Sequence, residues 1–379
     1  TRLVSDWSSD VCSSDLVEAR GRRLDNGQHI LIGAYRETLR LMTAVGVDPE
    51  RLLKRLPLEV NFPDGKGSHF RMRLPRLPAP LHLAFGLLGA RGVSVAEKFS
   101  AVRFMRFLQD ARYCLDADCT VSTLLDRHRQ RGKLRTCLWE SLCLAALNTS
   151  PKQASAQIFV NTLRDSLGGG RAATDLLLPA ADLDRLFPAA AASFIAAHGG
   201  KIRCATRVET IDDGFQVAGE RFDGVLLAVG PQHAATLLAR QQATAETAQL
   251  LAGYHFEPIA TVYCGYAPQL RLPFPMLGLA ARGRGEIGQW AFDRGALCGT
   301  PGVIAFVLSG HGAWEELDRQ ELVAQLDAEL ASALHTRLPV IAWQQVIREQ
   351  RATFSCRPGL RRPAARTARS GLWLADRES

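Results

Sequence analysis

The strongest constraint on the fold is the run Val225–Val229, which is wholly apolar and is followed at once by Gly230–Pro231. An unbroken apolar run of this kind predicts a strand buried on both faces of a parallel or mixed sheet. Before it, the sequence predicts a helix over 175–200 and short alternating strands over 201–221, and after it a helix over 232–252. Helices and strands mix without strict βαβ repetition, which predicts an α/β or mixed α+β fold.

The rest of the chain carries further strand and helix patterns. Leu39, Met42 and Val45 recur at helical spacing, and Gly46 marks the end of that helix. The other expected elements are a strand–turn–strand unit over 17–25, a hairpin over 58–75 around Asp64–Gly65, a helical hairpin over 120–150, strands over 255–310, a helix over 315–337 and a final strand over 340–356.

Length and charge narrow the class of protein. The 379 residues exceed what one hydrophobic core normally organises, so two domains are expected. The net charge is +8, but the basic residues are spread along the chain without a helix-turn-helix, zinc-finger or RNP-type signature, so nucleic acid is not an expected partner. The same charge suits peripheral contact with an anionic membrane surface.

Cysteine and histidine usage indicates a reduced, metal-free protein. The nine cysteines include no CxxC pair, and the histidines show no ligand-like spacing. No run approaches the ~20 apolar residues that span a bilayer. We therefore expect a cytoplasmic protein, with contact at the inner face of the plasma membrane left open. The sequence does not indicate an oligomeric state.

The segment LDNGQHILIGAY, residues 24–35, is the first candidate site. Gly27 has no Cβ, so the backbone there can lie close to a large planar ligand, and Gln28 and His29 follow with hydrogen-bonding groups. The alternative is an ordinary Asx-turn in front of a helix.

The segments 199–211 and 222–231 form a second candidate. They predict a glycine-capped helix, a meander and a strand that ends where a ligand crevice would form at the edge of the sheet. Plain sheet architecture without a ligand is the alternative.

Aromatic residues at alternating positions form the third candidate. One face of such a sheet could line an apolar tunnel, although a hydrophobic core is the commoner use of this pattern. The acids nearest to it in sequence are Asp293 and Glu257, which makes them candidate proton donors. The aromatic residues are Phe256, Tyr263, Tyr266, Trp290 and Phe292.

Several common motifs are missing from the positions where they would be informative. No GxGxxG follows a strand near the start, and the sequence has no GxSxG, HExxH or GxxxxGK[ST] motif. The glycine-rich stretch 278–288 is interpreted as a loop between strands.

Taken in order, the motifs resemble those of one family, hydroxysqualene dehydroxylases, which are squalene-associated FAD-dependent members of the amine oxidase and phytoene desaturase superfamily. The resemblance spans about 24–375. The segments that carry it are LDNGQHILIGAYRETL, LWESLCLAALNTSPKQASAQIFVNTLRDSL, DLLLPAADLDRLFP, GGKIRCATRVETI, DGVLLAVGP, FEPIATVYCGY, PMLGL, QWAFDR and VIREQRATFSCRPGLRRP.

The resemblance implies a two-domain fold with a Rossmann-like FAD domain. It implies that 17–57 and 175–252 are the remainder of the FAD-binding domain, that 58–174 and 253–356 form the substrate-binding domain, and that 357–379 is a truncated return to the FAD domain. Residues 1–16 are rich in Ser and Asp without any period and resemble translated adapter sequence, so we expect a non-native tail; a native disordered tail is the alternative.

The resemblance also implies the cofactor, the reaction and some site residues. FAD would lie against Gly27 and Gln28, and the Val208 backbone would contact its adenine. The implied reaction is reductive removal of the hydroxyl of hydroxysqualene, a long-chain isoprenoid, to give squalene. A carotenoid desaturase and a non-catalytic lipid-binding protein are the rival interpretations.

This sequence departs from the family pattern at both ends. The N-terminal βαβ unit with its GxGxxG is missing, and Asp376–Arg377 stand where a Gly-Asp pair is expected. Because those pieces hold the pyrophosphate and ribose in the family, we expect this chain to retain little flavin on its own, and its activity in this form is left open.

Overall fold

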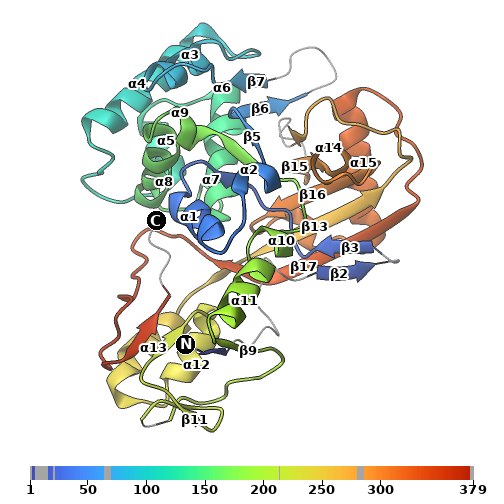
Figure 1. The fold of residues 1–379 in the computed structure, drawn as a ribbon. Helices are drawn as coiled ribbons and strands as arrows, with labels where there is room; N and C mark the ends of the chain where they lie inside the picture. The colour runs from blue at the N-terminus through green and yellow to red at the C-terminus, as the bar shows by residue number, and fades with distance from the viewer. Residues whose placement is uncertain are drawn as a thin grey trace.

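The protein is described from a computed structural model that covers residues 2–4, 16–19, 22–63, 70–212, 214–279 and 286–375. Figure 1 shows a larger upper body, in which helices flank a sheet, and a smaller lower lobe that contains α12 (Pro231–Leu238) and α13 (Ala245–Ala252). Helix α11 (Pro188–Ala197) runs between the two parts. Helices and strands are mixed as the sequence predicts. Within the described residues, no helix combines the length and the apolar character that crossing a membrane requires.

The central element of the upper body is a five-stranded antiparallel sheet in the order β14-β15-β16-β13-β17. Side chains alternate between its two faces along each strand. The expected strands over 255–310 and the final strand are confirmed here. Their bounds are β13 (Phe256–Gly265), β14 (Met276–Gly278), β15 (Trp290–Asp293), β16 (Val303–Ser309) and β17 (Trp343–Phe354).

One face of this sheet is covered by α15 (Arg319–Leu334), whose Leu322, Leu326 and Leu330 share a core with Val262 and Phe306 of the sheet. The expected helix over 315–337 is therefore confirmed. Asp318 begins it with a capping box in which its carboxylate accepts from the Glu321 amide.

The other face of the sheet belongs to the main core, which helices complete. The predicted helical hairpin is present, and Thr120 caps its first helix by accepting from the Thr123 amide. The predicted β-hairpin is β6 (Glu59–Phe62) with β7 (Phe70–Arg73), although its turn at Asp64–Gly65 lies outside the described residues. The helices are α3 (Leu81–Leu88), α4 (Val95–Asp110), α5 (Val121–Arg127), α7 (Ser141–Leu147) and α8 (Ala156–Leu163).

The prediction of one helix over 175–200 is wrong in its first part. Leu176–Pro179 form strand β8, which pairs with β4 (Leu31–Ile32) and β5 (Leu53–Leu56). All four residues of β8 are buried, because Leu176 and Leu178 face the main core while Leu177 faces a second core on the opposite side. Helical structure begins after the strand, with the short α10 (Leu183–Leu186) and then α11, which has Pro188 at its first position.

The N-terminal elements match their predictions. Strands β2 (Leu16–Ala19) and β3 (Arg22–Asp25) form the expected antiparallel unit. Helix α1 (Arg36–Ala44) follows, and Gly46 adopts a positive φ of 87° just after it, as a helix stop requires.

The lower lobe contains short strand pairs. β1 (Arg2–Val4) pairs in parallel with β9 (Lys201–Arg203), and β12 (Val225–Leu227) pairs in parallel with β18 (Leu372–Leu374). The expectation that β12 is buried on both faces is wrong, because Leu226 is 57% exposed. The proposed division into FAD-binding and substrate-binding segments stays a prediction.

Candidate functional site

The loop after β3 is fixed by an arginine from a distant part of the chain. Arg294, at the start of α14 (Arg294–Cys298), donates from Nη1 to Oε1 of Gln28 at 2.9 Å. Its Nη2 lies 3.2 Å from Oδ2 of Asp25. All three side chains are buried. A buried charge is costly unless it has a partner, and Asp25 is the charge partner of Arg294. Through its contacts with Asp25 and Gln28, Arg294 connects the 24–29 loop to the end of β15.

Asp25 is held from two further directions. Its Oδ1 accepts from the Leu183 amide at 2.9 Å, and its carbonyl accepts from the Tyr263 hydroxyl at 2.9 Å. Burial raises the pKa of the Asp25 carboxyl above its ordinary value, while the Leu183 amide and Arg294 oppose that rise. Burial likewise raises the pKa of Tyr263. The loop is therefore anchored by β13, by α14 and by the first residue of α10, Leu183.

Gly27 lies in this anchored loop, and nothing among the described residues requires a glycine there. It is absent from the residues with positive φ. A Cβ built on it would meet only His29 Nε2 at 3.7 Å and Thr261 Oγ1 at 3.8 Å, which are ordinary contacts. Gly27 therefore does not serve to supply a left-handed backbone conformation, and the Asx-turn alternative stays open. The space beside its backbone is compatible with the close approach of a planar ligand.

Both candidate acids, Asp293 and Glu257, are already engaged as hydrogen-bond acceptors within the chain. Asp293 caps α14, with Oδ1 accepting from the Ala296 amide at 2.9 Å and Oδ2 accepting from the Leu272 amide at 3.0 Å. Glu257 accepts from the Ser355 hydroxyl at 2.5 Å, and its other oxygen lies 3.8 Å from His311 Nε2. Both side chains are buried and act as acceptors. Their assignment as catalytic acids stays a prediction.

The five predicted substrate-lining aromatic residues do not lie together on one face of the sheet. Tyr263, Trp290 and Phe292 belong to the main core, where the Trp290 and Phe62 rings are 5.3 Å apart. Tyr266 packs on the opposite face of the sheet, against α15, and its hydroxyl donates to Asp327 at 2.8 Å. The expectation of a single face is wrong for Tyr266, because residues three apart in a strand point to opposite faces.

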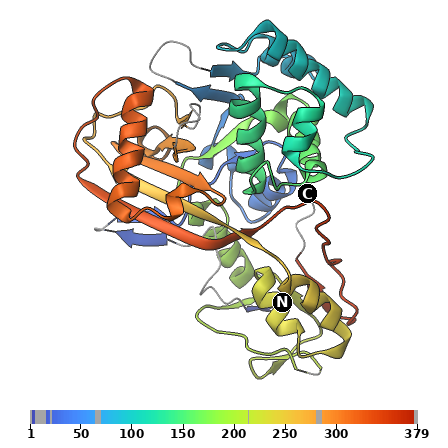
Figure 2. The same cartoon turned by 180° about the vertical axis from the view of Figure 1, so that it is seen from behind.

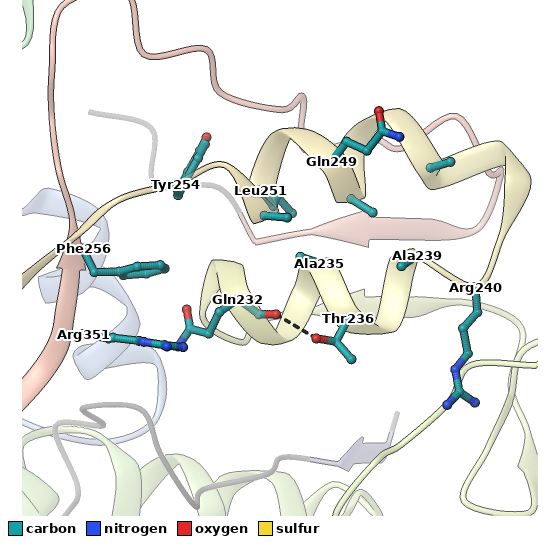
Figure 3. Close-up of a pocket in the computed structure, with 13 residues that line it drawn as sticks. Gln232, Ala235, Thr236, Ala239, Arg240, Gln249, Leu251, Tyr254, Phe256 and Arg351 are labelled. Carbon is teal, nitrogen blue, oxygen red and sulfur yellow. Dashed lines mark hydrogen bonds between the residues drawn. The ribbon is translucent and has the colours of Figure 1, made fainter.

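Phe256 lies apart from the others, at a cavity of about 810 Å³ between α12 and α13. Figure 3 shows its ring beside Arg351, whose guanidinium carbon is 5.9 Å from the ring centroid. Alanines such as Ala235 and Ala239 line much of the cavity. None of its lining residues comes from the 24–29 loop, so this cavity is separate from the Gly27 site. Val208 packs against the core of the lower lobe.

Two of the most distinctive sequence segments meet in the structure. Asn148 of LNTSP caps α7 in the left-handed conformation, and its Nδ2 donates to Thr353 Oγ1 at 3.0 Å. Its Oδ1 accepts from the Gly310 amide at 2.7 Å. The next residue, Thr149, accepts through Oγ1 from the Cys356 amide at 3.0 Å. LNTSP therefore joins α7 to the ends of β16 and β17, which explains the pattern as architecture.

The stretch 283–288, GRGEIG, has the spacing of a dinucleotide-binding fingerprint. It leads into strand β15 instead of opening a helix, so it lacks the context that such a fingerprint needs. Residues 280–285 lie outside the described residues.

Sequence reasoning missed the central pair of the site, Asp25 and Arg294. Both residues stand in segments that the sequence singles out, LDNGQ and QWAFDR, but nothing in either segment indicates the other. The described residues contain no group of three or more His, Cys, Asp or Glu side chains that could hold a metal ion.

A family model described as flavin containing amine oxidoreductase matches residues 7–377. The chain is 24% identical over 384 residues to a hydroxysqualene dehydroxylase of Rhodopseudomonas palustris, which covers 96% of this chain and 83% of that protein. It is also 25% identical over 259 residues to a hydroxysqualene dehydroxylase of Sinorhizobium fredii, and that alignment covers 64% of this chain and 57% of the relative. Cyclohexylamine oxidase of Brevibacterium oxydans shares the fold, with a TM-score of 0.64, 16% identity, and coverage of 98% of this chain and 86% of its own.

Proposed function

This chain belongs to the flavin-containing amine oxidoreductase family, and from that premise we propose that it reductively dehydroxylates hydroxysqualene to squalene. The family makes it an FAD-dependent oxidoreductase. The two relatives named hydroxysqualene dehydroxylase support the specific substrate, and such a product belongs to squalene and hopanoid biosynthesis. The single observation that carries the proposal is the alignment with the Rhodopseudomonas palustris protein, which extends over nearly the whole chain.

The Gly27 loop fits an FAD site. Gly27 supports this assignment, because the described atoms nearest to a Cβ built there lie at 3.7 and 3.8 Å, so none of them crowds its backbone on that side. Gln28 is held rigidly by Arg294, so the loop has no freedom to collapse into that space. We assign Gly27 and Gln28 to the flavin and the Val208 backbone to the adenine.

When bound, reduced FAD supplies the hydride that replaces the hydroxyl, and the hydroxyl leaves as water after it gains a proton. The chain must therefore do two things: deliver a proton to the leaving oxygen and keep water away from the allylic carbon while the bond breaks. The packed core around Trp290 and Phe292 serves the second purpose, because both side chains are almost fully buried.

Aromatic faces can stabilise an allylic cation electrostatically, and the side chains differ in how well they suit that role. The Arg294 guanidinium already lies over the Tyr263 ring, 6.0 Å from its centroid. A substrate cation at the same ring would be repelled by Arg294. We therefore assign Tyr263 to holding the 24–29 loop in place and not to contact with the substrate. Trp290 has no such neighbour at its ring among the described cation–ring contacts, and we assign it to the substrate side.

A carotenoid desaturase is the main rival, and it differs in the direction of electron flow. Desaturation oxidises the isoprenoid and leaves the flavin reduced, whereas dehydroxylation reoxidises a reduced flavin. A non-catalytic lipid-binding protein would do neither.

The direction of electron flow is directly measurable. The protein is saturated with FAD, reduced without oxygen, and mixed with hydroxysqualene while the flavin absorbance near ~450 nm is followed. We expect the oxidised flavin band to return with hydroxysqualene and to stay absent with squalene. If the oxidised protein is instead bleached by phytoene, the desaturase interpretation replaces this one.

A further inference from the structure

The outer face of helices α3 and α4 is unusually apolar for a surface. Leu81, Phe85 and Leu88 repeat at helical spacing along α3, and on α4 the exposed apolar residues are Val95, Phe99 and Phe107. Each of these six side chains is between 37% and 66% exposed. In Figures 1 and 2 the two helices lie along the outer edge of the upper body in both views.

These side chains are not needed for the core. The opposite face of α3 buries Leu83 and Leu87, and the inner face of α4 buries Phe104, Met105 and Leu108. Each helix therefore has a complete inward face and a second apolar row that contacts solvent. Exposed apolar surface of this extent, on adjacent helices, is typical of an interaction site.

The same surface is strongly basic. From 71 to 107 the sequence contains seven basic residues and one acidic residue, Glu97, which gives an excess of six positive charges. Glu97 is already engaged, since it accepts from the Ser94 and Leu134 amides at 2.8 and 3.4 Å. The basic residues are Arg71, Arg73, Arg76, Arg91, Lys98, Arg103 and Arg106.

Some of these cations are neutralised locally and others are not. Arg71 and Arg73 lie against Glu59, and Arg106 lies 3.8 Å from Asp110. Arg76, Arg91 and Arg103 are exposed, and the described part of the chain places no carboxylate within ion-pair distance of them.

We propose that this α3–α4 face docks on the surface of an anionic phospholipid bilayer. Apolar side chains that enter the headgroup region, flanked by arginines that meet lipid phosphates, are the two contributions that hold a protein at such a surface. A second copy of this chain fits the face poorly, because a two-fold contact would bring like charges together. The inference is independent of the proposed reaction. Where that reaction holds, docking places the protein beside the phase in which a long isoprenoid dissolves.

Vesicle co-sedimentation tests the docking face. The probes are phosphatidylcholine vesicles with and without phosphatidylglycerol. The first variant is Arg76→Glu with Arg103→Glu, and the second is Phe85→Ser with Phe99→Ser. The matched control is Arg319→Glu with Arg337→Glu, which reverses two exposed arginines, one at the start of α15 and one just beyond its end, and α15 lies away from the docking face.

The wild type is expected to bind the anionic vesicles, and to bind less as salt is added. The charge-reversal variant is expected to lose at least about tenfold in partition onto anionic vesicles. The Phe85/Phe99 variant should also lose binding to the anionic vesicles, and the α15 control should bind like the wild type. Circular dichroism melting confirms that each variant is folded.

Three results would overturn the proposal. The first is wild-type protein that stays in the supernatant with anionic vesicles. The second is an equal loss of binding in the α15 control, which would mean that only the overall positive charge matters. The third is a wild-type dimer in solution that the Phe85/Phe99 variant converts to a monomer, which would assign the face to a second copy.

Discussion

Arg294 donates a hydrogen bond to Gln28 across 266 positions of sequence, and the same guanidinium forms an ion pair with Asp25. The three side chains join the loop that carries Gly27 to the end of β15. The loop is thus positioned by the sheet of the upper body, which would give the proposed cofactor site a precision that a free loop lacks.

Removal of Arg294 should be costly. Arg294→Met leaves the Asp25 carboxylate buried without its charge partner, and we expect a loss of about 3–5 kcal/mol in the free energy of unfolding in urea. The double variant Asp25→Asn with Arg294→Met should recover part of that loss, because no uncompensated charge remains. As a control, Arg40→Met breaks an exposed pair with Glu37 and should change stability by less than about 1 kcal/mol. Equal effects of Arg294→Met and Arg40→Met would contradict this account.

Gly27 should matter for the cofactor and not for folding. Gly27→Ala has room in the chain and no positive φ to strain it, so the melting temperature should stay unchanged. Gly27→Val adds more bulk toward the proposed flavin position and should weaken FAD binding at least about tenfold in a fluorescence titration, a penalty of about 1.4 kcal/mol.

Gly33 provides the contrast to Gly27. A Cβ there would come impossibly close to the Ala172 carbonyl, so Gly33→Ala should lower the melting temperature clearly. If Gly27→Val binds FAD like the wild type while staying folded, the flavin does not lie against this loop.

Acidification should destabilise the fold through His82. Burial lowers the pKa of His82, and the nearby Arg171 adds to that effect. The unfolded chain takes up a proton at about pH 6.5 that the folded chain refuses, so stability is present above that pH and is lost as the pH falls below it, by up to about 1.4 kcal/mol per pH unit. His128, whose pKa burial also lowers, acts in the same direction.

His311 acts in the opposite direction to His82. Desolvation lowers the pKa of His311, but its charged and polar neighbours, Glu315 foremost, raise it by more. The contribution of the His311–Glu315 pair to folding stability is therefore lost as the pH rises. The effect is weak, since the side chain is 58% exposed and solvent screens it.

Denaturant melts at pH 7 and pH 5.5 check the role of His82. The variant His82→Leu should show a flatter pH dependence than the wild type. It should also be at least as stable at pH 7, because both ring nitrogens are buried and neither makes a well-formed hydrogen bond with a described residue. An unchanged pH slope in the variant would show that another group controls acid unfolding.

Local patterns predict local structure well in this chain. The period of Leu39, Met42 and Val45 predicts helix α1, and the turn at Gly46 carries the positive φ that the glycine implies. The resemblance in motifs leads to the family that the comparison identifies. These features depend on neighbours in sequence, which is why they can be predicted from it.

The failures share a physical cause, which is tertiary packing. Leu176–Pro179 are apolar enough for a helix or a strand, and only the flanking strands β4 and β5 make them a strand. Leu226 is exposed although its run is wholly apolar, because Val225 and Leu227 face the core of the lower lobe and Leu226 points to the opposite face of β12. The partnership of Asp25 with Arg294 connects two segments that nothing in their own patterns relates.

The most direct test of the proposed reaction is the mass of the product formed in heavy water. The FAD-saturated protein is reduced without oxygen in D2O, supplied with hydroxysqualene for a single turnover, and the extract is analysed by gas chromatography with mass spectrometry. A flavin hydride that has exchanged with D2O should give squalene carrying one deuterium on the carbon that lost the hydroxyl, together with reoxidised flavin. Unchanged hydroxysqualene beside flavin that is bound and still reduced would contradict the proposal.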